Sequence, residues 1–104
     1  MRNQFGNIWR EVAVKHFIIE RRIPGIAAFT QEQLRDAAIV SNAAFEKMPG
    51  RARWLQSFVV PDGTYCSYLA EDEEAIREHA RLSGFPASRI FEVAAVIGPE
   101  TASG

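Results

Sequence analysis

The residues best suited to chemistry in this 104-residue chain are its single cysteine and one of its two histidines. Cys66 lies in a short aromatic-rich run, and His79 lies on the apolar stripe of the segment that follows. A thiolate and an imidazole suit nickel, zinc or copper, and they also form a nucleophile–base pair. The structural alternative is a buried cysteine beside a hydrogen-bonded histidine at the edge of the core.

A tight metal site needs more donors than this pair supplies. His16, Glu92 and Glu20 are the residues that could join it, from the same chain or from a second copy. We therefore predict a metal set of Cys66, His79, His16 and Glu92, with nickel or another divalent transition metal as the cofactor. For His16 alone, a partly exposed or interface histidine is the alternative.

A second candidate site consists of charged and aromatic residues on predicted strands. Glu20 and Arg21 close the first strand, and because neighbours on a strand point to opposite faces, one of them can reach a cleft and orient a ligand. Trp54 and Tyr68 can line a pocket for an apolar ring or chain. The alternatives are an exposed ion pair and ordinary core packing. We predict Glu20, Arg21, Trp54 and Tyr68 as ligand-binding residues and assign no catalytic residue.

Six elements must position these residues. Residues 14–23 contain consecutive apolar residues, which is typical of a central strand, and alternation predicts strands at 53–60, 65–70 and 90–97. Pro61-Asp62-Gly63 predicts a hairpin turn between the second and third strands. A capping box at Thr30 begins one helix, which Pro49-Gly50 stops. Asp72 begins the other, over 73–83. In the second strand, alternation places Trp54 and Phe58 on the same face.

The order strand, helix, strand, strand, helix, strand predicts an α+β ferredoxin-like sandwich, βαββαβ. Both right-handed crossovers put their helices on one face of a four-stranded antiparallel sheet, with the first and third strands central. The other face receives several large apolar residues whichever way the strands are oriented. We therefore predict a homodimer through this open face, of the dimeric α/β-barrel type.

Composition excludes several classes of protein. The net charge of −1 argues against a non-specific nucleic-acid binder, and no apolar run approaches the ~18 residues of a membrane span. A single cysteine excludes an intramolecular disulfide and fits a reducing compartment, so we expect a cytoplasmic protein. We divide the chain into an N-terminal extension (1–13), one ferredoxin-like domain (14–98) and a loose tail (99–104).

The chain also resembles a known family, the nickel-responsive-protein-like domain of unknown function, a group of small bacterial proteins. The likeness runs from about Lys15 to Pro99 and is carried by the order and spacing of Glu20-Arg21 with Pro24-Gly25, Trp54-Leu55-x-Ser57, Tyr65-Cys66-x-Tyr68-x-Ala70, Glu74-Ala75-Ile76-Arg77 and Gly84-x-Pro86-Ala87. The resemblance implies a ferredoxin-like fold and dimerisation through the sheets. It implies nickel binding as a hypothesis, without mapping ligands onto this chain.

Three hypotheses for function follow. The first is a non-enzymatic dimer that binds a small ligand or a metal. The second is a cofactor-free enzyme of the dimeric α/β-barrel kind that acts on a small organic molecule, an analogy from architecture. The third is an interaction module that uses Trp9 and the N-terminal extension as its contact.

Overall fold

The computed structural model describes residues 14–103. Its main elements are β1 (Lys15–Arg22), α2 (Gln31–Glu46), β2 (Ala52–Val60), β3 (Gly63–Ala70), α3 (Glu73–Ser83) and β4 (Arg89–Glu92). Two short 3-10 helices, η1 (Ile26–Ala28) and η2 (Pro99–Ser103), complete the described chain. The predicted N-terminal extension, with Trp9, lies outside the described residues. No helix within residues 14–103 is both long enough and apolar enough to cross a membrane.

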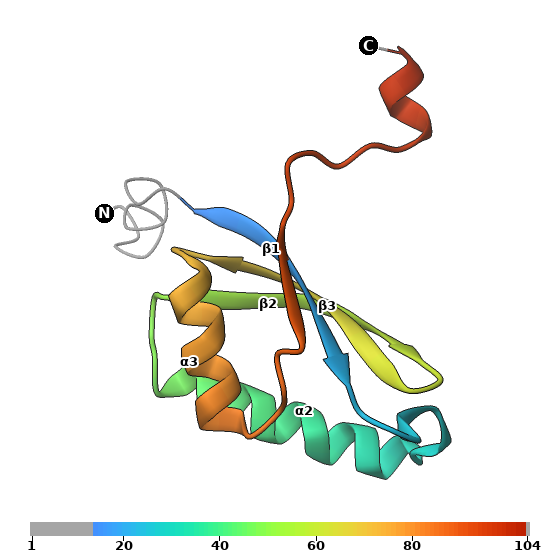
Figure 1. Ribbon diagram of the computed structural model, residues 1–104, viewed down its shortest axis with the longest axis vertical. Coiled ribbons are helices and arrows are strands. Elements are labelled where there is room, and N and C mark those ends of the chain that lie inside the picture. Colours follow the sequence, from blue (N-terminus) through green and yellow to red (C-terminus); the bar gives the residue numbers. More distant parts are fainter. Residues whose placement is uncertain (1–13, 104) are drawn as a thin grey trace, which may run out of the picture.

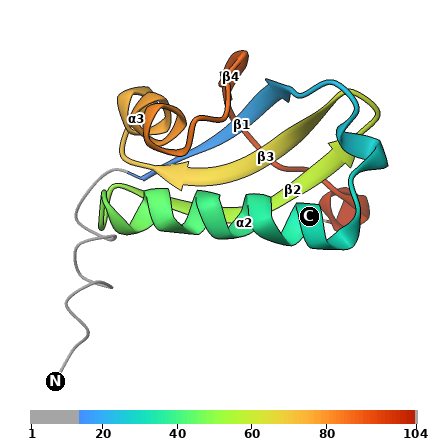
Figure 2. The same cartoon turned by 90° about the horizontal axis from the view of Figure 1, so that it is seen from below.

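The four strands form one antiparallel sheet in the order β2-β3-β1-β4, which confirms that the first and third strands are central. Tyr68 of β3 packs against Phe45 of α2 and His79 of α3, so both helices cover the same face. Figure 2 shows α2 running along the sheet, with α3 seen nearly end-on beside it. The α+β ferredoxin-like sandwich predicted from the element order is therefore confirmed.

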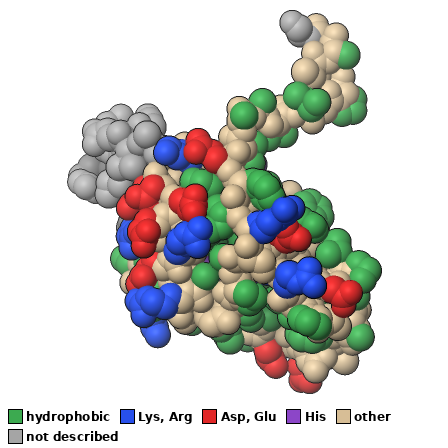
Figure 3. Space-filling model, in the orientation of Figure 1, with side chains coloured by type: hydrophobic (Ala, Val, Ile, Leu, Met, Phe, Trp, Pro, Cys, Tyr) green, Lys and Arg blue, Asp and Glu red, His purple; other side chains and the backbone are tan. Residues whose placement is uncertain are grey.

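Both helices begin as their sequences predict. Thr30 and Gln33 exchange the two hydrogen bonds of a capping box at the start of α2. At α3, the Asp72 carboxylate accepts from the Ala75 backbone N–H at 2.9 Å. Gly84 ends α3 with φ 82°, a left-handed conformation that favours glycine. Surface charges gather over α3, where Arg77 pairs with Glu73 (Figure 3).

Replacing the Asp72 cap should weaken α3 measurably. An Asp72→Ala variant leaves the Ala75 N–H without its side-chain acceptor, which should lower the free energy of unfolding by about 1 kcal/mol. Urea unfolding followed by circular dichroism measures this change. Arg35→Ala, an exposed substitution within α2, is the control and should stay within about 0.5 kcal/mol of the wild type. Equal stability of Asp72→Ala and wild type would show that the cap is dispensable.

The last strand is shorter than predicted. The alternation over 90–97 predicts a strand to Ile97, but β4 ends at Glu92. The reason is its partner: Glu92 pairs with Phe17, and β1 begins only two residues before Phe17. The Val93 N–H still donates to the His16 carbonyl oxygen at 2.8 Å, but the residues after Ala94 have no part of β1 to pair with. Residues 93–103 instead leave the body as an arm that ends in η2, where we expected a loose tail (Figure 1). Val96 and Ile97 on this arm are 76% and 78% exposed.

A β-bulge in β2 overturns the predicted faces of that strand. Trp54 pairs with Tyr68, but the register shifts at Leu55, so that Gln56 pairs with Ser67 and Phe58 with Tyr65. Residues paired directly across two strands share a face. Trp54 therefore faces the helices while Phe58 faces away, and the prediction that they share a face is wrong because the extra residue reverses the alternation.

The two faces of the sheet differ in what covers them. The helix side holds the core, built from Phe17, Ile19, Met48, Cys66, Tyr68, Ala70, Ala75 and Ile76. The other face has no helix among residues 14–103 and carries Ile18, Phe58, Leu69 and Phe91. Phe58 is 56% exposed and Phe91 is 43% exposed. These four residues, which we call the open face, agree with the prediction that large apolar side chains occupy that side.

Candidate functional site

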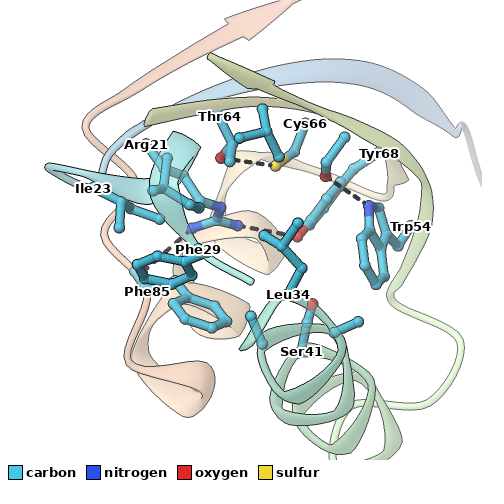
Figure 4. Close-up of a pocket in the computed structure, with 15 residues that line it drawn as sticks. Arg21, Ile23, Phe29, Leu34, Ser41, Trp54, Thr64, Cys66, Tyr68 and Phe85 are labelled. Atoms are coloured by element: carbon cyan, nitrogen blue, oxygen red, sulfur yellow. Dashed lines mark hydrogen bonds between the residues drawn. The ribbon is translucent and has the colours of Figure 1, made fainter. Parts of the chain in front are cut away.

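A cavity of about 240 Å³ lies between the sheet and α2. Its walls come from β1, β2 and β3, from the segment after β1, from α2 and from the loop after α3 (Figure 4). Most of the lining is apolar: Ile23, Ile26, Phe29, Leu34, Ala37, Ala38, Trp54, Val59 and Phe85, with Cys66 and Tyr68 on the sheet. Ala37 and Ala38 of α2 line the cavity, and their small side chains leave this space beneath the helix.

Among residues 14–103, Arg21 is the one charged residue in the cavity wall, and it is only 3% exposed. Its guanidinium donates to the carbonyl oxygens of Pro86 (2.8 Å) and Phe85 (3.3 Å) and to the hydroxyl of Tyr68 (3.1 Å). These bonds fix the side chain between β3 and the loop after α3. The close approach of β1 and β3 beside Arg21 depends on Gly63, because a Cβ at that position would collide with the Arg21 carbonyl oxygen.

Three of the four predicted ligand-binding residues, Arg21, Trp54 and Tyr68, therefore line one cavity. The indole Nε1–H of Trp54 donates to Ser57 at 2.9 Å, a bond that the β2 bulge makes possible by turning both residues toward the helices. Burial raises the pKa of Tyr68, although the nearby charge of Arg21 acts in the opposite direction. At neutral pH the phenol is therefore protonated.

Glu20, the fourth predicted ligand residue, lies on the opposite face of the sheet. It accepts from Arg89 at 2.8 Å and from the hydroxyl of Tyr65 at 3.4 Å. The alternation along β1 forces this separation, because Glu20 and Arg21 are neighbours on one strand. Glu20 therefore does not contribute to the cavity within one chain.

His79 is fully buried between the helices and the sheet. Its ring stacks on Phe45, with centroids 3.9 Å apart, and Nε2 lies 3.2 Å from the backbone carbonyl of Ser41. Because a carbonyl only accepts, this contact places the proton on Nε2. Nδ1 is then a buried acceptor with no partner in residues 14–103. Burial lowers the pKa of His79 to about 4, so the ring is neutral at pH 7.

The predicted metal residues are divided between the two faces of the sheet. Cys66 faces the helices, on the side of the sheet where His79 of α3 lies, and its thiol contacts the Thr64 hydroxyl at 3.3 Å. His16 lies on the other face, 2.6 Å from the Ser67 hydroxyl, and Glu92 is exposed on the edge strand. Within residues 14–103, no three His, Cys, Asp or Glu side chains gather as a metal site. The donors of the described chain do not by themselves fit nickel, and the predicted four-residue set remains untested.

Several residues that line the cavity were not predicted from the sequence. Phe29, Ser41, Thr64 and Phe85 all line the cavity, and Ser41 also contacts the His79 ring at 3.3 Å. Ser41 alone had a signal, since a polar residue interrupts the apolar stripe of α2. Phe29 and Phe85 lie in connections between elements, where periodicity gives no indication of direction.

Comparisons with known proteins agree with this architecture. A family model described as nickel responsive protein SCO4226-like matches residues 17–93. The crystal structure of SCO4226 from Streptomyces coelicolor A3(2) is similar, with a TM-score of 0.64 and 24% identity over 79% of this chain and 99% of that chain. At that identity the likeness shows the fold alone, and no curated protein matches the chain. Because the family model spans most of the sequence, the chain belongs to the family of nickel-responsive SCO4226-like proteins.

Proposed function

We propose that this protein binds a small organic molecule in the cavity between the sheet and α2. The observation that carries the proposal is that Arg21, Trp54 and Tyr68, three residues separated widely in sequence, meet in one cavity. Ligand sites of proteins are concave and mostly apolar, with a few polar groups that fix orientation. This cavity has that composition, because its lining is mostly apolar and its polar side chains include Arg21, Ser41, Ser57, Thr64 and Tyr68 (Figure 4).

The size of the cavity limits the ligand. Sites for drug-sized molecules occupy roughly 300–1,000 Å³, so a cavity of about 240 Å³ suits a single ring or a short chain. The neutral His79 and the protonated Tyr68 nearby have no charge at pH 7. Binding is therefore governed by apolar contact and by Arg21.

Nuclear magnetic resonance with a panel of one-ring and short-chain compounds tests this function. The panel includes neutral and anionic members, and the indole N–H of Trp54 reports on the cavity in a Trp9→Phe background, where it is the single tryptophan. We expect a saturable shift of that signal with at least one compound. Ala38→Phe places a ring in the cavity and should weaken this binding at least tenfold.

Ala43→Phe is the matched control for this substitution. It introduces the same ring on an exposed part of α2, outside the cavity lining, and should bind the panel as the wild type does. The proposal is wrong if no panel member produces a saturable shift, or if Ala38→Phe and Ala43→Phe bind equally well.

We also propose that two copies of the chain associate through the open face. Its apolar side chains support this, because a solvent-exposed sheet face of this kind is characteristic of an interaction surface. The exposed apolar arm, residues 93–103, offers a second copy further surface to bury. Nickel binding and the enzyme alternative stay predictions. The family description refers to nickel, but a nickel site would need donors beyond those of residues 14–103 in one chain.

A further inference from the structure

Arg21 is a buried cation without a carboxylate partner in the described chain. The four ion pairs within residues 14–103 join Arg51–Glu71, Arg77–Glu73, Arg81–Glu78 and Arg89–Glu20. Two carbonyl oxygens and a phenol accept from Arg21, but none carries a negative charge. Removing an unpaired ion from water costs several kcal/mol. A bound anion in the cavity would offset that cost.

The guanidinium also has unused hydrogen-bonding capacity. Arginine has five N–H donors in a planar fork, and the three bonds of Arg21 leave at least two of them without an acceptor in residues 14–103. The fork matches the two oxygens of a carboxylate. Figure 4 shows Arg21 extending from β1 into the cavity, toward Tyr68.

We propose that the ligand of this cavity is a small organic acid, with its carboxylate on Arg21 and its apolar ring or chain against Trp54 and Phe29. This inference rests on the proposed function and specifies the class of its ligand. A monocarboxylate matches the charge of the site, because Arg21 is the only charged residue that the described part of the chain contributes to the wall, and it supplies one positive charge. Inorganic phosphate, which is a mixture of the monoanion and the dianion near neutral pH and has no apolar part, fits the site less well.

Calorimetry with benzoate and benzamide tests the ligand class, because the two probes have the same ring and differ in charge. The wild type should bind benzoate at least tenfold more tightly than benzamide, and it should bind inorganic phosphate weakly. In Arg21→Gln, which removes the charge and keeps an N–H₂ donor, the benzoate-to-benzamide ratio should fall to near one. Equal affinity of the wild type for the two probes overturns the inference.

A second variant keeps Arg21 in place, in case Arg21→Gln does not fold. Thr64 pairs with Arg21 in the sheet and lines the same cavity, so Thr64→Asp supplies an internal carboxylate beside the guanidinium. This variant should also lose the preference for benzoate, while Thr64→Ser should retain it. A preference unchanged in Thr64→Asp contradicts the inference.

The two proposals fail in different ways. If benzamide and benzoate bind the wild type equally, the ligand class is wrong but small-molecule binding stands. If the whole panel fails to bind, the proposed function is wrong.

Discussion

Lowering the pH from 7 to 5 should reduce the stability of this protein by about 2 kcal/mol through His79 alone. The pKa of His79 is about 4 in the folded chain and 6.5 when the residue is exposed. The unfolded state therefore binds a proton first as the pH falls. The stabilisation is fully present above pH 6.5 and is lost progressively as the pH falls toward 4.

The surroundings of His79 explain why the folded state excludes this proton. Desolvation by burial is the largest cause of the lowered pKa of His79. The hydrogen bond that the ring donates to the Ser41 backbone carbonyl raises this pKa, whereas the positive charge of Arg21 lowers it further. The groups packed against the ring are Phe45 and Ser41 of α2 and Tyr68 of β3. None of them is an anion that could stabilise an imidazolium.

Urea unfolding at pH 7 and pH 5, at one protein concentration, measures this effect. His79→Gln retains a donor for the Ser41 carbonyl but does not titrate. Its free energy of unfolding should therefore fall by about 2 kcal/mol less than that of the wild type between pH 7 and pH 5. His16→Gln, which changes the histidine on the other face and keeps His79, is the control and should still show the loss that His79 causes. An identical loss in His79→Gln and wild type would refute the assignment.

Two lysines on the open face should convert the proposed dimer to a monomer. In Phe58→Lys/Phe91→Lys, each chain loses two apolar side chains from the proposed interface and adds charges that a two-fold axis brings together. Burying one phenylalanine stabilises by about 1.5–3 kcal/mol, so the dissociation constant should rise at least about 100-fold. Sedimentation velocity at micromolar concentration should show twice the 11.6 kDa chain mass for the wild type and one chain mass for the variant.

Ile39→Lys is the matched control for the open face. Ile39 is 53% exposed on α2, so the substitution makes the same kind of chemical change on the helix side of the sheet. This variant should sediment as the wild type does. A wild type that sediments as a single chain at these concentrations, or a doubly substituted variant that remains dimeric, would exclude association through the open face.

Local sequence signals predicted most of the fold because the interactions behind them are local. The capping box at Thr30, the cap at Asp72 and the left-handed Gly84 each depend on a few consecutive residues. The candidate site was predicted in part. Arg21, Trp54 and Tyr68 were identified by residue type, and the structure brings them together, whereas Glu20 lies on the other face.

The sequence by itself determined the order of elements, and with it the sheet order and the side of the sheet that the helices cover, because crossover handedness leaves one arrangement. The tertiary structure alone decided three further features: the bulge that turns Trp54 into the cavity, the end of β4 at Glu92, and the isolation of Arg21 from any carboxylate of the described chain. Each depends on which residue lies opposite another across the sheet or the core. Such pairings join distant parts of the chain, so periodicity within one segment cannot specify them.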